Sequence, residues 1–449
     1  MRKGNLMKQL LCISMFFIFH FSFFILNAQN GFNMPYSQFG IGNSDLPGNM
    51  PMATRMGGVI YTQSGNNFVN PFNPASYAGV ETESFVFDMG LGIQISTLRD
   101  RNAKQPDADG NLSYLTFAMP LTKWWKVAGG LMPLTTVDYE SVSQSSYLDT
   151  GIVKTVYDGT GGANQVFLGT AFNIPAGKSR SLQVGFNANY ITGNVQRAIS
   201  FEFQGNDSTY YMNSRRYRET HLSNFTFDFG LQLRQQLGEK FTLGLGLVYK
   251  PYRDMTVKDK ALIYTFHASD ETLVDTIFPS RGGDDSFTSR LEQSPTFGIG
   301  LSLERNKRWR IAADATLAVN NGMRYTEDTT HAIMGSSALR YGPYSRYALG
   351  FERLGDMDAA SYWGRMSWSA GVHMEQGSMY LELNGEDQRI DEWGAGLGVT
   401  MPMRKGRSLL TLSLGYSSYG STDILQRNML SIGIAVSSCE RWFVKRKFN

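Results

Sequence analysis

The chain has 449 residues, a formal net charge of +3 and two cysteines. The first 28 residues hold three basic residues and no acidic ones, so the remainder is neutral, which argues against a nucleic-acid-binding role. Cys439 is the only cysteine after residue 28, so that part forms no internal disulfide. A mean hydropathy of −0.26 excludes a bundle of apolar membrane helices.

The N-terminus has the pattern of an export signal. Basic residues precede an apolar run from Leu10 to Leu26, and the small residue Ala28 follows. This pattern predicts a secretory signal peptide over residues 1–28. A membrane anchor is the alternative, because the run is at the short limit for a spanning helix.

Residues 29–83 differ from the rest of the chain. They contain five prolines and little two-residue alternation, so long strands and helices are excluded. They also contain many large apolar residues, such as Met56, Phe72 and Tyr77, which need a buried environment. We therefore expect residues 29–83 to form a plug inside a barrel. A disordered tail is the alternative.

In residues 84–449, large apolar residues alternate with Gly, Ser, Thr, Asp or Asn. Phe225–Leu231, Phe241–Leu247 and Leu410–Tyr416 are examples. Successive strand side chains point to opposite faces, so one face suits lipid and the other an aqueous lumen. The period predicts about fourteen strands, many of a length that crosses a bilayer. The predicted fold is all-β, a transmembrane antiparallel β-barrel; a soluble β-sandwich is the alternative.

Aromatic residues crowd the predicted strand ends, as at Trp124-Trp125, Trp309 and Tyr416, and this is typical of interfacial girdles. Short turns are predicted near 173–180, 238–240, 306–308 and 402–406. Longer polar connections are predicted near 99–111, 140–161, 201–219, 265–286 and 321–342. Alternating short and long connections predict an even strand number with both termini at the periplasmic side.

Two motifs resemble the N-terminal hatch of FadL-type outer-membrane transporters. The first runs from Ala53 to Gly58 and the second from Asn73 to Ala78, just before the first predicted strand. The resemblance implies a fourteen-stranded barrel closed by an N-terminal hatch, which takes up hydrophobic compounds such as long-chain fatty acids. An ordinary Asn-Pro turn is the alternative. The hatch motif is Asn73, Pro74 and Ala75, and the supporting residues are Met56, Gly57 and Gly58.

The third predicted strand contains residues that weaken a β-ladder. Gly129, Gly130 and Pro133 lie within it, and proline cannot donate a ladder hydrogen bond. In FadL-type barrels a strand kink opens the wall sideways, so we predict a lateral opening here. A plain bulge at the strand end is the alternative.

Catalytic and metal-binding patterns are weak. Of the four histidines after residue 28, only His373 has a clear lumen-facing position, and a solvated lumen histidine is the simplest interpretation. The acidic stretches 107–111 and 282–285 lack the spacing of calcium loops. We expect no enzyme activity, no cofactor and no metal. The lumen-facing charges are predicted to form a ladder that holds the plug: Asp88, Asp228, Asp314, Arg234, Arg310 and Arg346.

These observations predict an exported protein of the outer membrane of a Gram-negative-type cell. Its expected function is passive uptake of a hydrophobic small molecule, with outer-membrane lipid and that ligand as its partners. The alternative is a barrel without transport activity that serves as an accessory in secretion or surface assembly and binds a protein partner. A lumen filled by polar side chains and an immobile plug would favour the alternative.

Overall fold

The structure is a computed structural model. It describes residues 34–44, 48, 50–147, 151–177, 179–204, 211–267, 273–277, 286–305, 308–318, 323–326, 339–383, 385–403 and 407–441. The predicted signal peptide lies outside the described residues.

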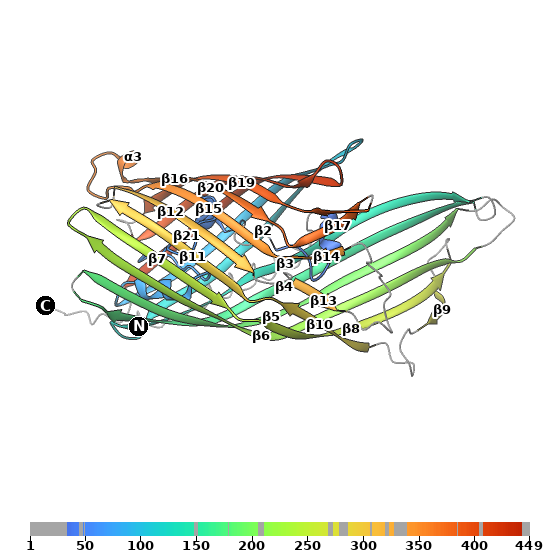
Figure 1. Ribbon diagram of the computed structural model, residues 1–449, viewed down its shortest axis with the longest axis horizontal. Coiled ribbons are helices and arrows are strands. Elements are labelled where there is room, and N and C mark those ends of the chain that lie inside the picture. Colours follow the sequence, from blue (N-terminus) through green and yellow to red (C-terminus); the bar gives the residue numbers. More distant parts are fainter. Residues whose placement is uncertain are drawn as a thin grey trace, which may run out of the picture.

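The alternating segments form strands that pair in chain order around a closed barrel (Figure 1). The barrel closes because β1 pairs along its whole length with β21, and from Val86 to Arg99 with β2. The strands are β1 (Ser84–Arg99), β2 (Lys104–Pro120), β3 (Trp125–Tyr147), β4 (Gly151–Pro175), β5 (Arg180–Gln204), β6 (Asn213–Leu237), β7 (Phe241–Lys250), β8 (Arg253–Phe266), β9 (Leu273–Ile277), β10 (Ser286–Gln293), β11 (Thr296–Arg305), β12 (Trp309–Ala318), β13 (Met323–Thr326), β14 (Leu339–Tyr341), β15 (Tyr344–Arg353), β16 (Ser367–Gln376), β17 (Met379–Leu383), β18 (Glu386–Arg389), β19 (Glu392–Met403), β20 (Ser408–Ser421) and β21 (Leu425–Arg441).

Several of these strands are pieces of one interrupted strand. For example, β8 pairs with β10 while β7 pairs with β11, and the register continues across both interruptions. Five strands of the wall are made of such pieces: β9 to β11, β12 with β13, β14 with β15, β16 with β17, and β18 with β19. Joined in this way, the described strands make a closed antiparallel barrel of 14 strands. The predicted fold class is confirmed.

The outer face carries an apolar band between two aromatic rows. At the end with short turns, Trp124 stacks on Phe172, and Phe241 contacts Trp309 edge to face. At the other side of the band, Tyr249 contacts Phe297. Outward residues between the rows, such as Ile299 and Leu301, are exposed. The band from Phe241 to Tyr249 has about the length that a tilted strand needs to cross a bilayer.

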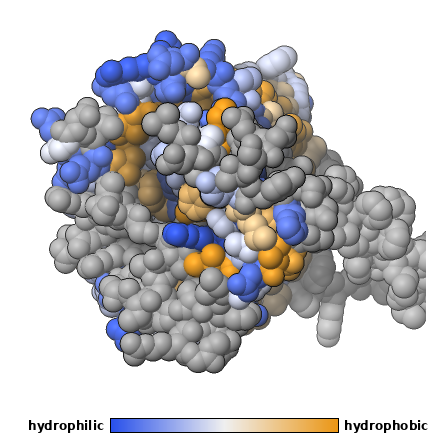
Figure 2. All heavy atoms as spheres, turned by 90° about the vertical axis from the view of Figure 1, so that its right-hand side faces the viewer, coloured by the Kyte–Doolittle hydropathy of each residue, from blue (hydrophilic) through white to orange (hydrophobic). Residues whose placement is uncertain are grey.

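The strands β3 to β6 continue far beyond this band (Figure 1). Three of them have 25 residues each, more than twice the roughly 9–11 that a tilted strand needs to cross a bilayer. The predicted long connections near 99–111 and 140–161 are therefore mostly strand. These polar segments were predicted as loops, and the prediction was wrong because strands that extend outside the membrane need no apolar residues facing lipid. Figure 2 looks onto this end and shows hydrophobic residues between hydrophilic ones around a hollow.

The helices are short: η1 (Pro35–Gln38), α2 (Pro51–Thr54), η2 (Pro74–Gly79) and α3 (Tyr362–Arg365). Among the described residues, no helix has the length and apolarity to cross a membrane. The first three belong to the segment before β1, which lies against the inner wall. We call residues 50–80 the plug and residues 34–44 the N-terminal segment. Both contribute to the buried core together with inward-facing wall residues.

Candidate functional site

The plug contacts the wall at glycines that face the lumen. A Cβ atom at Gly371 or Gly396 would overlap plug backbone atoms of Met56 or Thr54. On other strands too, plug atoms occupy the space that a wall side chain would fill, so the plug follows these glycines around the lumen. The wall glycines at which a Cβ would come within 3.0 Å of plug backbone include Gly185, Gly230, Gly246, Gly350, Gly371 and Gly396, and at Gly300 and Gly433 it would meet plug side-chain atoms instead. The alternating glycines, predicted to line a wet lumen, therefore create space for a closely packed plug.

Wall carboxylates hold the plug backbone. Asp314 accepts hydrogen bonds from the backbone N–H groups of Ile60 and Tyr61, the latter at 2.8 Å. Asp88 accepts one from Val69 N–H at 3.3 Å. These carboxylates, predicted as members of a charge ladder, thus satisfy plug backbone donors, which are costly to bury unpaired.

A buried ion triad links the plug to the wall. The carboxylate of Glu352 accepts from Arg55 of the plug and from Arg310 of the wall. Glu352 and Arg55 are 3 % and 2 % exposed. Breaking such a buried group is strongly destabilising, because it leaves a charge without a partner.

The hatch motif is seated between β5 and β6. Asn73 Oδ1 accepts from Ala75 N–H at 3.1 Å and so caps η2, while Asn73 Nδ2 donates to the Tyr61 carbonyl at 2.8 Å. A Cβ at Gly185 would lie 2.5 Å from the carbonyl carbon of Pro74. The triplet thus turns the chain against the wall. Its role in gating remains a prediction.

Replacing Asn73 with alanine is expected to loosen the plug. Asn73 is fully buried, and its loss leaves donors and acceptors unsatisfied, at a cost of about 1–3 kcal/mol. Limited proteolysis of the detergent-purified barrel measures this as faster cleavage within residues 50–80. The matched control is Asn66→Ala at an exposed position. Equal cleavage rates in the two variants would show that Asn73 does not hold the plug.

The supporting residues lie on the opposite side of the lumen. Met56 is fully buried, and the carbonyls of Gly57 and Gly58 accept from Arg346. Both glycines have positive φ, 64° and 83°, a conformation that disfavours any side chain. The structure thus separates the two motifs, which hold the plug at two places.

Of the residues singled out on β3, Pro133 lies just beyond the point where β2 and β3 separate. The β2–β3 ladder runs only from Pro120↔Lys126 to Leu115↔Leu131, and the β3–β4 register shifts between Pro133 and Thr135. Gly129 and Gly130 lie within the paired part. Within the described residues no strand pairing joins β2 and β3 beyond Leu131. We call this stretch, residues 104–114 of β2 and 132–147 of β3, the seam. A function in lateral release remains a prediction.

The N-terminal segment covers part of the seam from inside. Asn43 and Thr136 form an isolated antiparallel bridge, with N–H···O distances of 2.9 and 3.0 Å in the two directions. Further along β3, Met34 N–H donates to the Asp138 carbonyl, and Asp138 N–H donates to Ser37 Oγ. The side chain of Ile41 packs in the apolar cluster behind. The N-terminal segment therefore supplies hydrogen-bond partners for backbone groups of β3 that β2 does not pair with.

The seam is acidic. Asp107 and Asp109 of β2 lie close enough to Asp138 of β3 to affect its titration. Burial, reinforced by these two carboxylates, raises the pKa of Asp138 to about 6. A cation at this position would relieve the repulsion.

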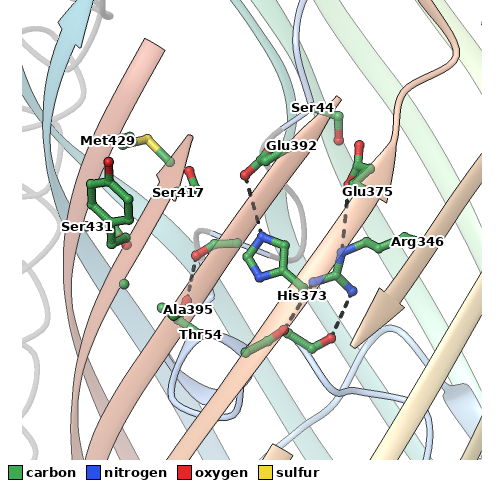
Figure 3. A pocket seen from close by; sticks show the side chains of 15 residues that line it. Ser44, Thr54, Arg346, His373, Glu375, Glu392, Ala395, Ser417, Met429 and Ser431 are labelled. Carbon is green, nitrogen blue, oxygen red and sulfur yellow. Dashed lines mark hydrogen bonds and ion pairs between the residues drawn. The ribbon is translucent and has the colours of Figure 1, made fainter. Parts of the chain in front are cut away.

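A polar cavity lies between the plug and the wall at β15 to β21 (Figure 3). His373 Nε2 lies 3.6 Å from Glu392 Oε1, and Arg346 Nε lies 3.7 Å from Glu375 Oε2. Most of its lining residues are charged, hydroxyl-bearing or glycine, with Met429 and Ala395 among the few apolar ones, so this cavity suits a polar occupant better than a purely hydrophobic ligand. Ser369, on the same face as His373, instead donates to the Gly398 carbonyl, so no Ser–His pair forms here.

Alternation identifies inward residues but not their partners. Asp228 pairs with Arg253, which the sequence did not single out, and Arg310 pairs with Glu352. The wall amides that hold the plug were also not predicted from the sequence. Asn187 and Gln232 donate to the carbonyls of Pro71 and Tyr61, at 3.1 and 2.8 Å. Their inward positions in alternating strands were the signal that could have found them.

Comparisons with known proteins identify a matching family and solved structures of similar fold. The family model BamG matches residues 6–449. No curated protein matches the chain. A FadL homologue of Pseudomonas aeruginosa has a TM-score of 0.51 at 11% identity, over 86% of this chain and 98% of its own. The toluene transporter TodX of Pseudomonas putida has 0.51 at 15%, over 92% and 99%. The predicted resemblance to FadL-type barrels is confirmed for the fold.

Proposed function

The chain belongs to the BamG family, and on that premise we propose that it is an outer-membrane barrel that acts through protein partners in β-barrel assembly. Bam denotes the β-barrel assembly machinery. The end with short turns then faces the periplasm, and the long strands β3 to β6 project outside the cell. This proposal shares with the alternative that the sequence left open a barrel without transport activity that binds a protein partner, but it assigns that partner to barrel assembly and not to secretion or surface assembly.

The observation that carries the proposal is the fit of the plug to the wall. Plug backbone fills the space beside wall glycines on strands around the barrel, and buried charges join the two. Movement of such a plug would break many contacts together and leave buried charges without partners. A lumen of this kind supports a structural role better than a passage.

Uptake of a hydrophobic molecule is the second candidate. It is favoured by the fold likeness to toluene transporters and by the seam, and opposed by the polar lining of the described cavity. The two candidates differ in whether the plug must move.

A disulfide that locks the plug distinguishes them. A Cβ at Gly300 would lie 3.2 Å from Thr62 Cγ2, within reach of a disulfide in Thr62→Cys/Gly300→Cys. The same Cβ would lie 2.5 Å from Asp314 Oδ1, so the Asp314 side chain has to shift when this cysteine is introduced. Cells that carry only the locked protein are expected to assemble folded, heat-modifiable outer-membrane barrels at the wild-type level, and the tagged protein is expected to co-purify with the central barrel of the assembly machinery. The Thr62→Cys and Gly300→Cys single variants are the controls, since Gly300→Cys alone adds the same Cβ atom without the bond.

The opposite result would support transport. The locked protein would then fail to accumulate labelled oleate or toluene until a reductant is added, while barrel assembly and co-purification show no dependence on this chain.

A further inference from the structure

Beyond the N-terminal segment, no strand among the described residues pairs with the seam side of β3. The N–H and C=O groups of Thr136 and Asp138 bond to the N-terminal segment, so residues of this parity face the seam rather than β4. The register with β4 is regular from Thr135 to Tyr147. Ladder geometry therefore directs the N–H groups of Val142, Gln144 and Ser146 to the seam.

This edge is exposed. Every residue from Glu140 to Tyr147 is exposed, and Val142 and Tyr147 show 47% and 56% of their surface. An exposed edge of this length is a template for another strand. The bridge between Asn43 and Thr136 shows that the same edge already accepts an extended segment.

The acidic residues beside this edge favour the binding of a basic segment. Asp138 and Glu140 share one face of β3, and Asp107 and Asp109 lie near Asp138. Their mutual repulsion falls when cationic side chains approach. Acidic segments would add to the repulsion instead.

We propose that the β3 edge from Val142 to Tyr147 binds an extended, basic segment of a partner polypeptide by strand addition. The inference rests on the proposed function and names the chemistry of the partner. Backbone hydrogen bonds to the seam-facing groups supply affinity, and Lys or Arg side chains opposite the seam carboxylates supply selectivity.

The test uses full-length protein in detergent with the photo-crosslinker p-benzoylphenylalanine in place of Val142. The probes are two peptides of equal length, one with alternating Lys and Val, the other with alternating Glu and Val. Cross-linking to the Lys peptide alone is expected. The control position is Thr155 of β4, which pairs with Ser143 and Phe201 on its two sides.

Edge variants test the backbone contribution. Gln144→Pro removes an N–H that faces the seam and leaves the β4 ladder intact, whereas Gln144→Thr keeps the N–H. The proline variant should reduce the cross-linking yield about fivefold, as expected for one lost backbone hydrogen bond, and the threonine variant should not.

Equal yields with both peptides, equal yields from Thr155, or no effect of Gln144→Pro would overturn the inference. Co-purification with the assembly machinery is measured in parallel on the wild type. Its presence with any of those outcomes refutes only strand addition at this edge, and its absence refutes the proposed function.

Discussion

Alanine at both Gly371 and Gly396 is expected to displace the plug and open the barrel to ions. At each position the new Cβ atom would overlap plug backbone, which cannot rotate away as a side chain could. Overpacking of this kind costs about 1–3 kcal/mol per site. We expect a lower melting temperature in detergent and ion conductance in planar bilayers where the wild type is closed.

The matched control is Gly110→Ala on β2. The nearest atoms to a Cβ at Gly110 are 3.8 and 4.0 Å away, an ordinary contact distance. Heat-modifiable migration on gels confirms that each variant forms a barrel, so conductance reports on the plug alone. A double variant that folds, melts like the wild type and stays closed would refute the view that glycines seat the plug.

These glycines show what alternation can and cannot predict. In segments such as Phe241–Leu247 the period assigns glycine to the inner face, and the structure agrees. It does not reveal what occupies the lumen, because a glycine suits water and a closely packed backbone equally well. Knowledge of the plug path was needed to tell the two apart.

The ion pairs show the same limit. Arg310 pairs within the wall, as a ladder requires, with Glu352 directly opposite it on β15. The sequence did not single out Glu352, and the same carboxylate also binds Arg55 of the plug, 297 residues away in the chain. The contact between Arg55 and Glu352 depends on the position of the plug in the lumen, which has no local signal in the sequence. The motif around Asn73 was found because its turn is local.

Loss of the Glu352 carboxylate is expected to have the largest effect on stability. Glu352→Gln leaves Arg55 and Arg310, 2 % and 8 % exposed, without their shared counter-charge. Breaking a buried ion group in this way costs about 3–5 kcal/mol. Thermal unfolding in detergent should show a marked drop in the melting temperature, and proteolysis should release the plug first.

Two controls separate charge from general disruption. Asp423→Asn removes an exposed ion pair with Arg101, whose side chains are 53% and 72% exposed, and should change the melting temperature little. The triple variant Arg55→Met/Arg310→Met/Glu352→Leu removes all three charges and should recover most of the loss, because apolar groups of similar size can replace a buried ion network. If the triple variant is less stable than Glu352→Gln, the group is itself stabilising. If Glu352→Gln has no effect, the plug is held by its backbone contacts with the wall glycines.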